Sequence, residues 1–250
     1  MKSRNLIVDL GCAILCLFIA ATAFAQPDAD FAKANQDYAA GQFQEAIKSY
    51  ETFIHSREFS ANLFYNLGNA YFRAGDLGEA ILNYQRALAL DRNHPEADAN
   101  LRIVRDEARA LELAPRPIER FLRLASANQF AITAAIAFWV GIFSFVGLIF
   151  ARRRAPGALA LAILSLSIFA TAVFAVYLID NGTNGRSHAI VTGNGVEARL
   201  ATADNANTVL ALPPGSEIKI LSTRGDWIYA ALPNNLRGWL PTKSAELVRL

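Results

Sequence analysis

Residues 130–151 read FAITAAIAFWVGIFSFVGLIFA and residues 158–179 read ALALAILSLSIFATAVFAVYLI, and neither stretch holds a charged side chain. An α-helix of about 20 residues crosses the hydrocarbon layer of a bilayer, which is about 30 Å thick. Helices in a soluble core seldom reach this length without a polar face. We therefore expect two transmembrane helices, and the alternative is a pair of buried core helices.

The segment between the two stretches, residues 152–157, reads RRRAPG. It allows only a tight turn between antiparallel helices, and its three arginines are costly to move across a membrane, so the turn should face the cytoplasm. Neither stretch contains an ionisable residue, and no path for an ion or a proton is visible. The hairpin is thus expected to be an anchor, in which Gly141, Gly147 and Ser165 are small enough to let the helices approach closely.

The first 25 residues are typical of a secretory signal peptide. Lys2 and Arg4 precede an apolar stretch, and the segment ends on the small-x-small sequence Ala-Phe-Ala. An uncleaved anchor helix is the alternative. Cleavage would place the next segment outside the cytoplasm and would remove Cys12 and Cys16, the two cysteines of the chain. The mature chain would then have no disulfide, thiolate metal site or cysteine nucleophile.

Residues 26–114 contain an internal repeat, and its period of about 34 residues is typical of helix-turn-helix repeats. Asn35, Gly41, Ala46, Ile47 and Tyr50 recur as Asn69, Gly75, Ala80, Ile81 and Tyr84. The second copy resembles the tetratricopeptide repeat, with Leu67, Gly68, Tyr71, Ala80, Tyr84 and Ala87 at the packing positions of that family. A third copy begins at Pro95 and is soon stopped by further prolines. We therefore expect an all-α solenoid of two repeats and a capping helix.

The first helix of each repeat should build a concave surface. Asn66, Asn69 and Arg73 are spaced to share one helical face, and Asn35 is the counterpart of Asn69 in the first repeat. The resemblance implies that such positions hold a bound peptide or carboxylate. The predicted groove residues are Asn35, Tyr38, Tyr65, Asn66, Asn69, Phe72 and Arg73. The alternative is a solvated polar face without a ligand.

After a polar linker at residues 180–187, residues 188–250 form six short alternating runs separated by turn residues. This pattern predicts a small all-β barrel. The order of its motifs, with Trp227 and Trp239 as anchors, resembles bacterial SH3-like domains. Trp227, Tyr229 and Trp239 are candidates for a ligand groove, and their alternative role is to close the core.

Charge and chemistry exclude several function classes. Residues 26–114 carry 14 acids against 9 bases, so no soluble segment is basic enough to favour nucleic acid. Six arginines against one acid in residues 115–157 place the basic excess beside the hairpin, and residues 115–129 should include an interfacial helix on anionic lipid. His55, His94 and His188 have no spacing typical of a metal site and are expected at the surface. An enzyme, a cofactor and a metal are not expected.

The order of signal, helical repeats, two-span hairpin and SH3-like domain resembles the BatE proteins of the bacterial aerotolerance group. The resemblance implies a non-catalytic subunit of an inner-membrane complex, with both soluble domains in the periplasm and von Willebrand factor A-domain proteins among its partners. The alternative is a cell-wall protein that binds peptidoglycan and recruits a hydrolase or division factor through its repeats.

Overall fold

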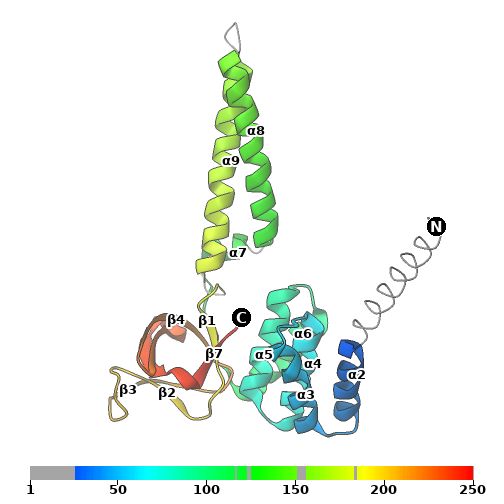
Figure 1. Cartoon of the computed structure of the whole chain (residues 1–250). Helices are drawn as coiled ribbons and strands as arrows, with labels where there is room; N and C mark the ends of the chain where they lie inside the picture. The colour runs from blue at the N-terminus through cyan, green and yellow to red at the C-terminus, as the bar shows by residue number, and fades with distance from the viewer. Residues whose placement is uncertain (1–25, 116, 123–124, 151–155, 183–184, 250) are drawn as a thin grey trace, which may run out of the picture. The chain divides into compact units, whose positions relative to one another are not determined.

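The computed structural model describes residues 26–115, 117–122, 125–150, 156–182 and 185–249. The predicted signal segment and the arginines of the turn lie outside the described residues. The chain divides into two compact units, Met1–Ala108 and Arg109–Leu250 (Figure 1). The first unit is helical, and the second holds the apolar helices and a β-sheet.

The first unit contains helices α2 (Gln26–Ala39), α3 (Phe43–His55), α4 (Ala61–Ala74), α5 (Leu77–Leu90) and α6 (Pro95–Ala108). Two helix-turn-helix pairs are followed by one further helix, as the repeat period predicts. Gly75, at φ +85°, ends α4 in the left-handed conformation that glycine adopts without strain. The Asp76 side chain then accepts the Glu79 N–H and caps α5.

Gly68 is where the two helices of the second repeat touch. A Cβ atom at this position would lie 2.8 Å from the ring of Tyr84 and 3.3 Å from the Ala80 carbonyl oxygen. Tyr84 and Ala80 are both fully buried. The absence of a side chain at Gly68 therefore lets α4 and α5 pack in contact.

The second unit contains α7 (Pro117–Leu122), α8 (Ala127–Phe150) and α9 (Pro156–Asn181). The long helices α8 and α9 form the predicted antiparallel hairpin (Figure 1). Helix α8 begins before its predicted stretch, and α9 extends beyond both ends of its own. They meet along small residues: a Cβ atom at Gly141 would lie 3.0 Å from the Ser165 hydroxyl. A Cβ atom at Gly147 would meet nothing within 4 Å, so this glycine is not part of the contact.

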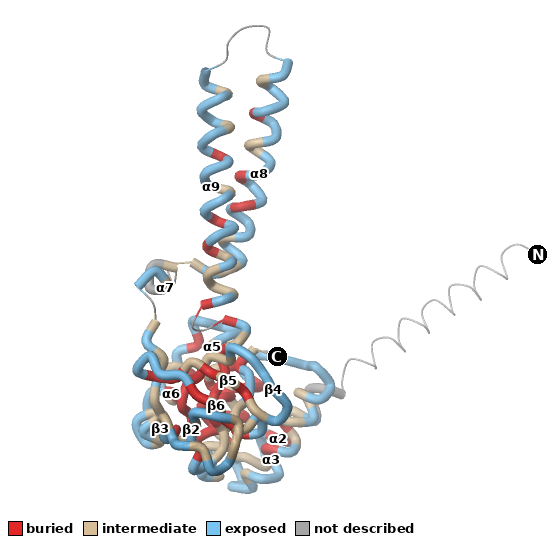
Figure 2. Tube along the Cα trace, turned by 90° about the vertical axis from the view of Figure 1, so that its left-hand side faces the viewer, coloured by how far each residue is buried: buried red, intermediate tan, exposed pale blue. Residues whose placement is uncertain are grey.

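The apolar side chains of the hairpin are mostly uncovered (Figure 2). Only 17% of the most apolar 18-residue window of each helix is buried. Phe143 is 69% exposed and Phe150 is 79% exposed. A core helix of a soluble protein would bury these side chains. Both helices are long and apolar enough to cross a membrane, and their exposure favours lipid over a protein core.

Hydroxyl groups on the hairpin bond to the backbone of their own helix, as expected for polar groups in an apolar medium. Thr133 donates to the Gln129 carbonyl, and Thr171 donates to the Ser167 carbonyl. Ser165 donates in the same way within α9. These hydroxyl groups therefore form their hydrogen bonds within their own helix, which is consistent with an anchor.

The C-terminal part is one antiparallel sheet of seven strands. They are β1 (His188–Val191), β2 (Val196–Arg199), β3 (Thr208–Leu212), β4 (Glu217–Arg224), β5 (Trp227–Ala231), β6 (Arg237–Pro241) and β7 (Ala245–Leu247), in the order β3-β2-β6-β5-β4-β1-β7. The six predicted runs are all strands. β7 was not among the predicted runs. The core of this all-β domain includes Ala198, Ile218 and Leu240, which are fully buried.

A segment from before the hairpin completes this all-β domain. The Glu217 N–H donates to the Leu111 carbonyl at 2.8 Å, and the Leu111 N–H donates to the Ser216 hydroxyl at 3.1 Å. The Leu113 N–H donates to a Glu217 carboxylate oxygen at 3.1 Å. The Leu111 side chain packs against the core of the domain. Residues 111–113 thus join residues that follow the hairpin, although more than 100 positions separate them in sequence.

The expectation that all three histidines lie at the surface is wrong for two of them. His55 is exposed, but His188 is 2% exposed in β1 and His94 is 9% exposed. The His188 ring faces a buried carboxylate, with Nε2 3.9 Å from Glu217 Oε1. A buried polar ring is tolerated where polar groups surround it, and Glu217 is supplied by the neighbouring strand β4.

We predict that Gly68→Ala destabilises the repeats by about 1–3 kcal/mol and that Gly68→Leu prevents their native packing, because any Cβ atom meets the Tyr84 ring. Thermal unfolding of the full chain in detergent, followed by far-ultraviolet circular dichroism, measures the change. Gly147→Ala is the matched control, since its added methyl group meets no neighbour. Equal melting of Gly68→Ala and the unaltered chain would contradict this packing role.

Candidate functional site

Three of the predicted groove residues, Asn35, Asn66 and Asn69, are tied into the fold by hydrogen bonds that repeat along the solenoid. In the first repeat, the Tyr50 hydroxyl donates to Asn35 Oδ1 at 2.6 Å, and Asn66 Nδ2 donates to the same oxygen at 3.2 Å. The Asn35 oxygen thus joins the first repeat to the second one. We call this arrangement the asparagine ladder.

The second repeat contains the same arrangement. The Tyr84 hydroxyl donates to Asn69 Oδ1 at 2.7 Å, and Asn100 Nδ2 donates to it at 2.9 Å. Burial raises the pKa of Tyr50 to about 12, and burial also raises the pKa of Tyr84. Both hydroxyls therefore keep the proton that they donate at physiological pH. Asn35 and Asn69 serve the packing of the repeats, whatever else they bind.

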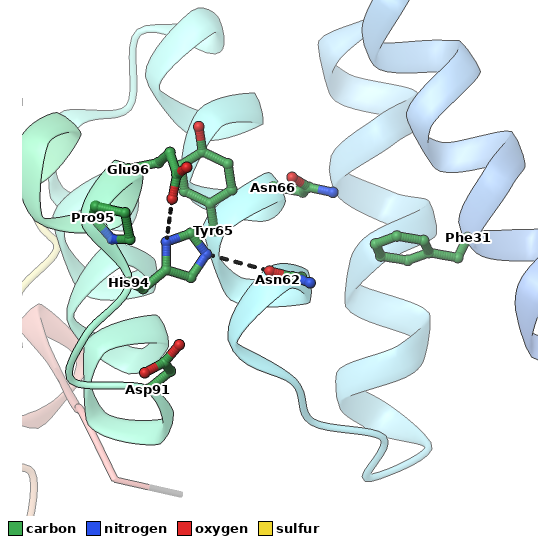
Figure 3. Close-up of a pocket in the computed structure, with 8 residues that line it drawn as sticks. All are labelled: Phe31, Asn62, Tyr65, Asn66, Asp91, His94, Pro95 and Glu96. Carbon is green, nitrogen blue, oxygen red and sulfur yellow. Dashed lines mark hydrogen bonds and ion pairs between the residues drawn. The ribbon is translucent and has the colours of Figure 1, made fainter.

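A cavity of about 500 Å³ opens beside the ladder. Its wall comes from α2, from the first turns of α4, and from the end of α5 through the start of α6. It is lined by Phe31, Asn62, Tyr65, Asn66, Asp91, His94, Pro95 and Glu96 (Figure 3). A cavity of this size is in the range that holds small molecules or a few side chains of a peptide. The cavity belongs wholly to the first unit.

His94 builds the wall of this cavity and is buried for a local reason. Its Nδ1 atom accepts the Ala97 N–H at 3.3 Å, so the imidazole caps α6. In that tautomer Nε2 carries the proton and faces Asn62 Oδ1 at 3.3 Å. The ring also lies 4.9 Å from the ring of Tyr65. These three contacts fix one wall of the cavity.

The predicted groove residues do not all lie in one place. Tyr65 and Asn66 line the cavity. Tyr38 packs edge-on against Phe43 at 5.6 Å, and the Arg73 guanidinium lies over the same Phe43 ring at 5.1 Å. Both are absent from the lining of the cavity, as is Phe72, which is partly buried. The predicted set therefore divides: Tyr65 and Asn66 line the cavity, Asn35 and Asn69 hold the asparagine ladder, and Tyr38 and Arg73 contact Phe43.

Sequence reasoning missed the other six lining residues, which are Phe31, Asn62, Asp91, His94, Pro95 and Glu96. The repeat period contained a signal for one of them, because His94 is the counterpart of Ser60. The Ser60 hydroxyl accepts the Leu63 N–H and caps α4, as His94 caps α6. Carrying the period past the second repeat would have placed His94 at a helix cap and not on open surface.

The three predicted groove residues of the all-β domain share one face of the sheet. Trp239 pairs with Tyr229 on one side and with Arg199 on the other, and the rings of Tyr229 and Trp239 are 5.0 Å apart. Trp227 is two positions from Tyr229 and so points to the same face. All three aromatic rings are partly exposed. They form a second candidate surface, away from the buried face that holds Ile228 and Leu240.

Comparison with known proteins identifies the helical part. A family profile described as tetratricopeptide repeat matches residues 31–98. Residues 31–98 are tetratricopeptide repeats. This region runs from α2 into the start of α6 and contains every residue that lines the cavity. No curated protein matches the chain. Because these repeats are a protein-interaction motif, the cavity lies on a module of the kind that binds other proteins.

We predict that the repeats lose stability as the pH rises from about 10 towards 12. Folding raises the pKa of Tyr50 above its value in the unfolded chain, which is near 10. The stability that the protonated hydroxyl contributes is therefore complete below about pH 10. It is lost as the pH rises through the pKa of the folded state. Tyr50→Phe removes one such group. The variant should melt at a lower temperature than the unaltered chain at pH 7, but its melting temperature should fall less between pH 7 and pH 12. Melting curves across this range, with Tyr229→Phe as the control in the other unit, measure the difference. An unchanged alkaline slope in Tyr50→Phe would contradict the prediction.

Proposed function

We propose that this protein is a membrane-anchored, non-catalytic adaptor that captures protein partners through its tetratricopeptide repeats. The observation that carries the proposal is the open cavity on a protein-interaction repeat, in a chain that also holds two exposed apolar helices. Among the described residues, no group of three or more His, Cys, Asp or Glu side chains is placed to hold a metal ion.

The topology that we propose follows from the contact between residues 111–113 and the all-β domain. These segments flank the hairpin, so they lie on the same side of any membrane that the hairpin crosses. In the sequence, three arginines at 152–154 separate the two apolar stretches, and a loop rich in arginine favours the cytoplasm. We propose that the hairpin lies in a bacterial inner membrane with both soluble domains in the periplasm, which also fits cleavage of a signal within residues 1–25.

The finer assignment rests on resemblance. The order of domains is similar to that of the BatE proteins, and the seven-stranded domain with its partly exposed tryptophans suits an SH3-like module. We propose a subunit of an aerotolerance-type complex, with von Willebrand factor A-domain proteins as a partner class and membrane lipid in contact with the hairpin.

A second candidate function is peptidoglycan binding, and the aromatic face of the all-β domain favours it. Tyr229 and Trp239 lie side by side at 5.0 Å, with Arg199 next in the row. Flat aromatic rings beside a cation suit a carbohydrate or peptide ligand. Retention of the protein on purified sacculi, and its loss in Trp239→Ala, would favour this function over the adaptor.

We predict that reporter fusions at Glu112, Ala155 and Leu250 read periplasm, cytoplasm and periplasm. The expected pattern follows from an even number of spans after signal removal and from the arginine-rich turn. Paired alkaline phosphatase and green fluorescent protein fusions report the two compartments with opposite signals. A cytoplasmic signal at Leu250 would overturn the topology.

We predict that anchoring increases partner capture without a specific contact in the membrane. The anchor confines the chain and a membrane-bound partner to the same layer, which raises the effective concentration of one for the other. A variant in which a flexible linker replaces residues 115–181 keeps residues 111–113 with the all-β domain but loses the anchor. Crosslinking and co-purification should recover much less partner from this variant than from the full chain.

An unrelated two-span hairpin in place of residues 127–181 is the matched control, and it should restore recovery. If recovery is equal with and without an anchor, the hairpin contributes no avidity. If only the native hairpin restores recovery, specific contacts within the membrane are required.

A further inference from the structure

We propose that the repeat cavity binds a basic side chain of the partner, with arginine preferred, and not the carboxylate that the resemblance implies. This inference rests on the proposed function, because it names the chemistry of the partner segment that the repeats capture. It follows from the charge, the hydrogen-bonding groups and the aromatic rings that surround the cavity.

The formal charge around the cavity is negative. Asp91 and Glu96 line it, both are exposed to solvent, and none of the eight lining residues is a lysine or an arginine. A carboxylate entering the cavity would meet two like charges, whereas a cation would meet two opposite ones.

The amides around the cavity add acceptors for a donor-rich ligand. Asn66 uses its Nδ2 atom to bond to Asn35, which turns its Oδ1 atom away from α2 (Figure 3). One Glu96 oxygen lies 3.1 Å from His94 Nδ1, and Asp91 Oδ1 accepts the Asn93 N–H at 3.0 Å. Each carboxylate has further lone pairs for a ligand. A guanidinium has five N–H donors and no acceptor, so it matches such a wall.

Aromatic rings supply the apolar part of the site. Phe31 and Tyr65 line the cavity from α2 and α4 (Figure 3). Phe31 is held by edge-on contacts with Tyr50 at 5.7 Å and Phe53 at 5.9 Å. Arginine combines a planar cation, which stacks on aromatic rings, with an apolar stem. These features favour arginine over the compact ammonium of lysine.

Arg73 is the basic residue that the resemblance would assign to binding a carboxylate, but it contacts another part of the repeats. The Arg73 guanidinium lies over the ring of Phe43 at 5.1 Å and is not part of the cavity wall. The tetratricopeptide repeats of this chain therefore keep a groove of the expected kind but present the opposite charge at its cavity.

The test uses the full chain in detergent micelles and a library of capped pentapeptides with random flanking positions. The central residue is arginine, its neutral isostere citrulline, lysine or glutamate. The bound pool should be enriched in arginine over citrulline by about tenfold, which corresponds to about 1.4 kcal/mol for the two exposed charge contacts together. The double variant Asp91→Asn and Glu96→Gln should abolish this enrichment. The control variant, Asp106→Asn and Glu107→Gln, makes the same charge change at exposed sites outside the cavity and should retain it.

A second pair of variants tests the aromatic wall. Tyr65→Phe keeps a ring and should retain the arginine preference, whereas Tyr65→Ala should reduce it. Enrichment of glutamate, equal recovery of arginine and citrulline, an unchanged preference in the double acid variant, or no peptide binding would each overturn the inference. Partner recovery from cells is measured separately with the same double variant. Recovery that persists in that variant would leave the adaptor function in place while this account of its cavity fails.

Discussion

The hydrogen bonds between residues 111–113 and the start of β4 constrain how the second unit can fold. They join Leu111 to Ser216 and Glu217 across 105 and 106 positions of sequence, which include the whole hairpin. Such a long closure is costly in chain entropy, and the partial burial of Leu111 against the core of the all-β domain offsets part of that cost. With both flanks fixed to each other, the helices between them must be antiparallel.

A charged cluster fixes the same unit at the end of α9. Asp180 lies in the last turn of that helix, where a negative charge opposes the helix dipole. Arg186 at 2.8 Å and Arg249 at 3.3 Å offset this cost, and the Lys219 ammonium bonds to the carbonyl of Asn181. The described residues of the predicted linker therefore bond to the helix end and to the all-β domain. The domain is attached to the hairpin by its strands and by its C-terminal residues.

Most of the fold could be predicted from the sequence, because each part of the chain has its own characteristic residue pattern. The repeat spacing predicted the helix pairs, the uncharged stretches predicted the hairpin, and alternation predicted six strands. Contacts between distant segments have no period, so residues 111–113 were read as the end of the repeats. The burial of His188 was missed for the same reason, since it depends on Glu217 in another strand. The groove residues were predicted as one set, but only Tyr65 and Asn66 line the cavity.

The repeats also explain why periodicity alone is a poor guide to a binding site. The residues that recur, Asn35 and Asn69, accept hydrogen bonds from buried tyrosines, and every repeat needs them to pack against the next. Apart from Asn66, which recurs as Asn100, the cavity wall instead uses positions at which the copies differ. The counterpart of Asn62 in the third copy is Glu96, and the counterpart of the helix-capping residue Ser60 is His94. A position shared by all repeats cannot distinguish one end of the solenoid from the other. Ligand selectivity must therefore come from residues that break the period, and in this chain those residues carry the negative charge.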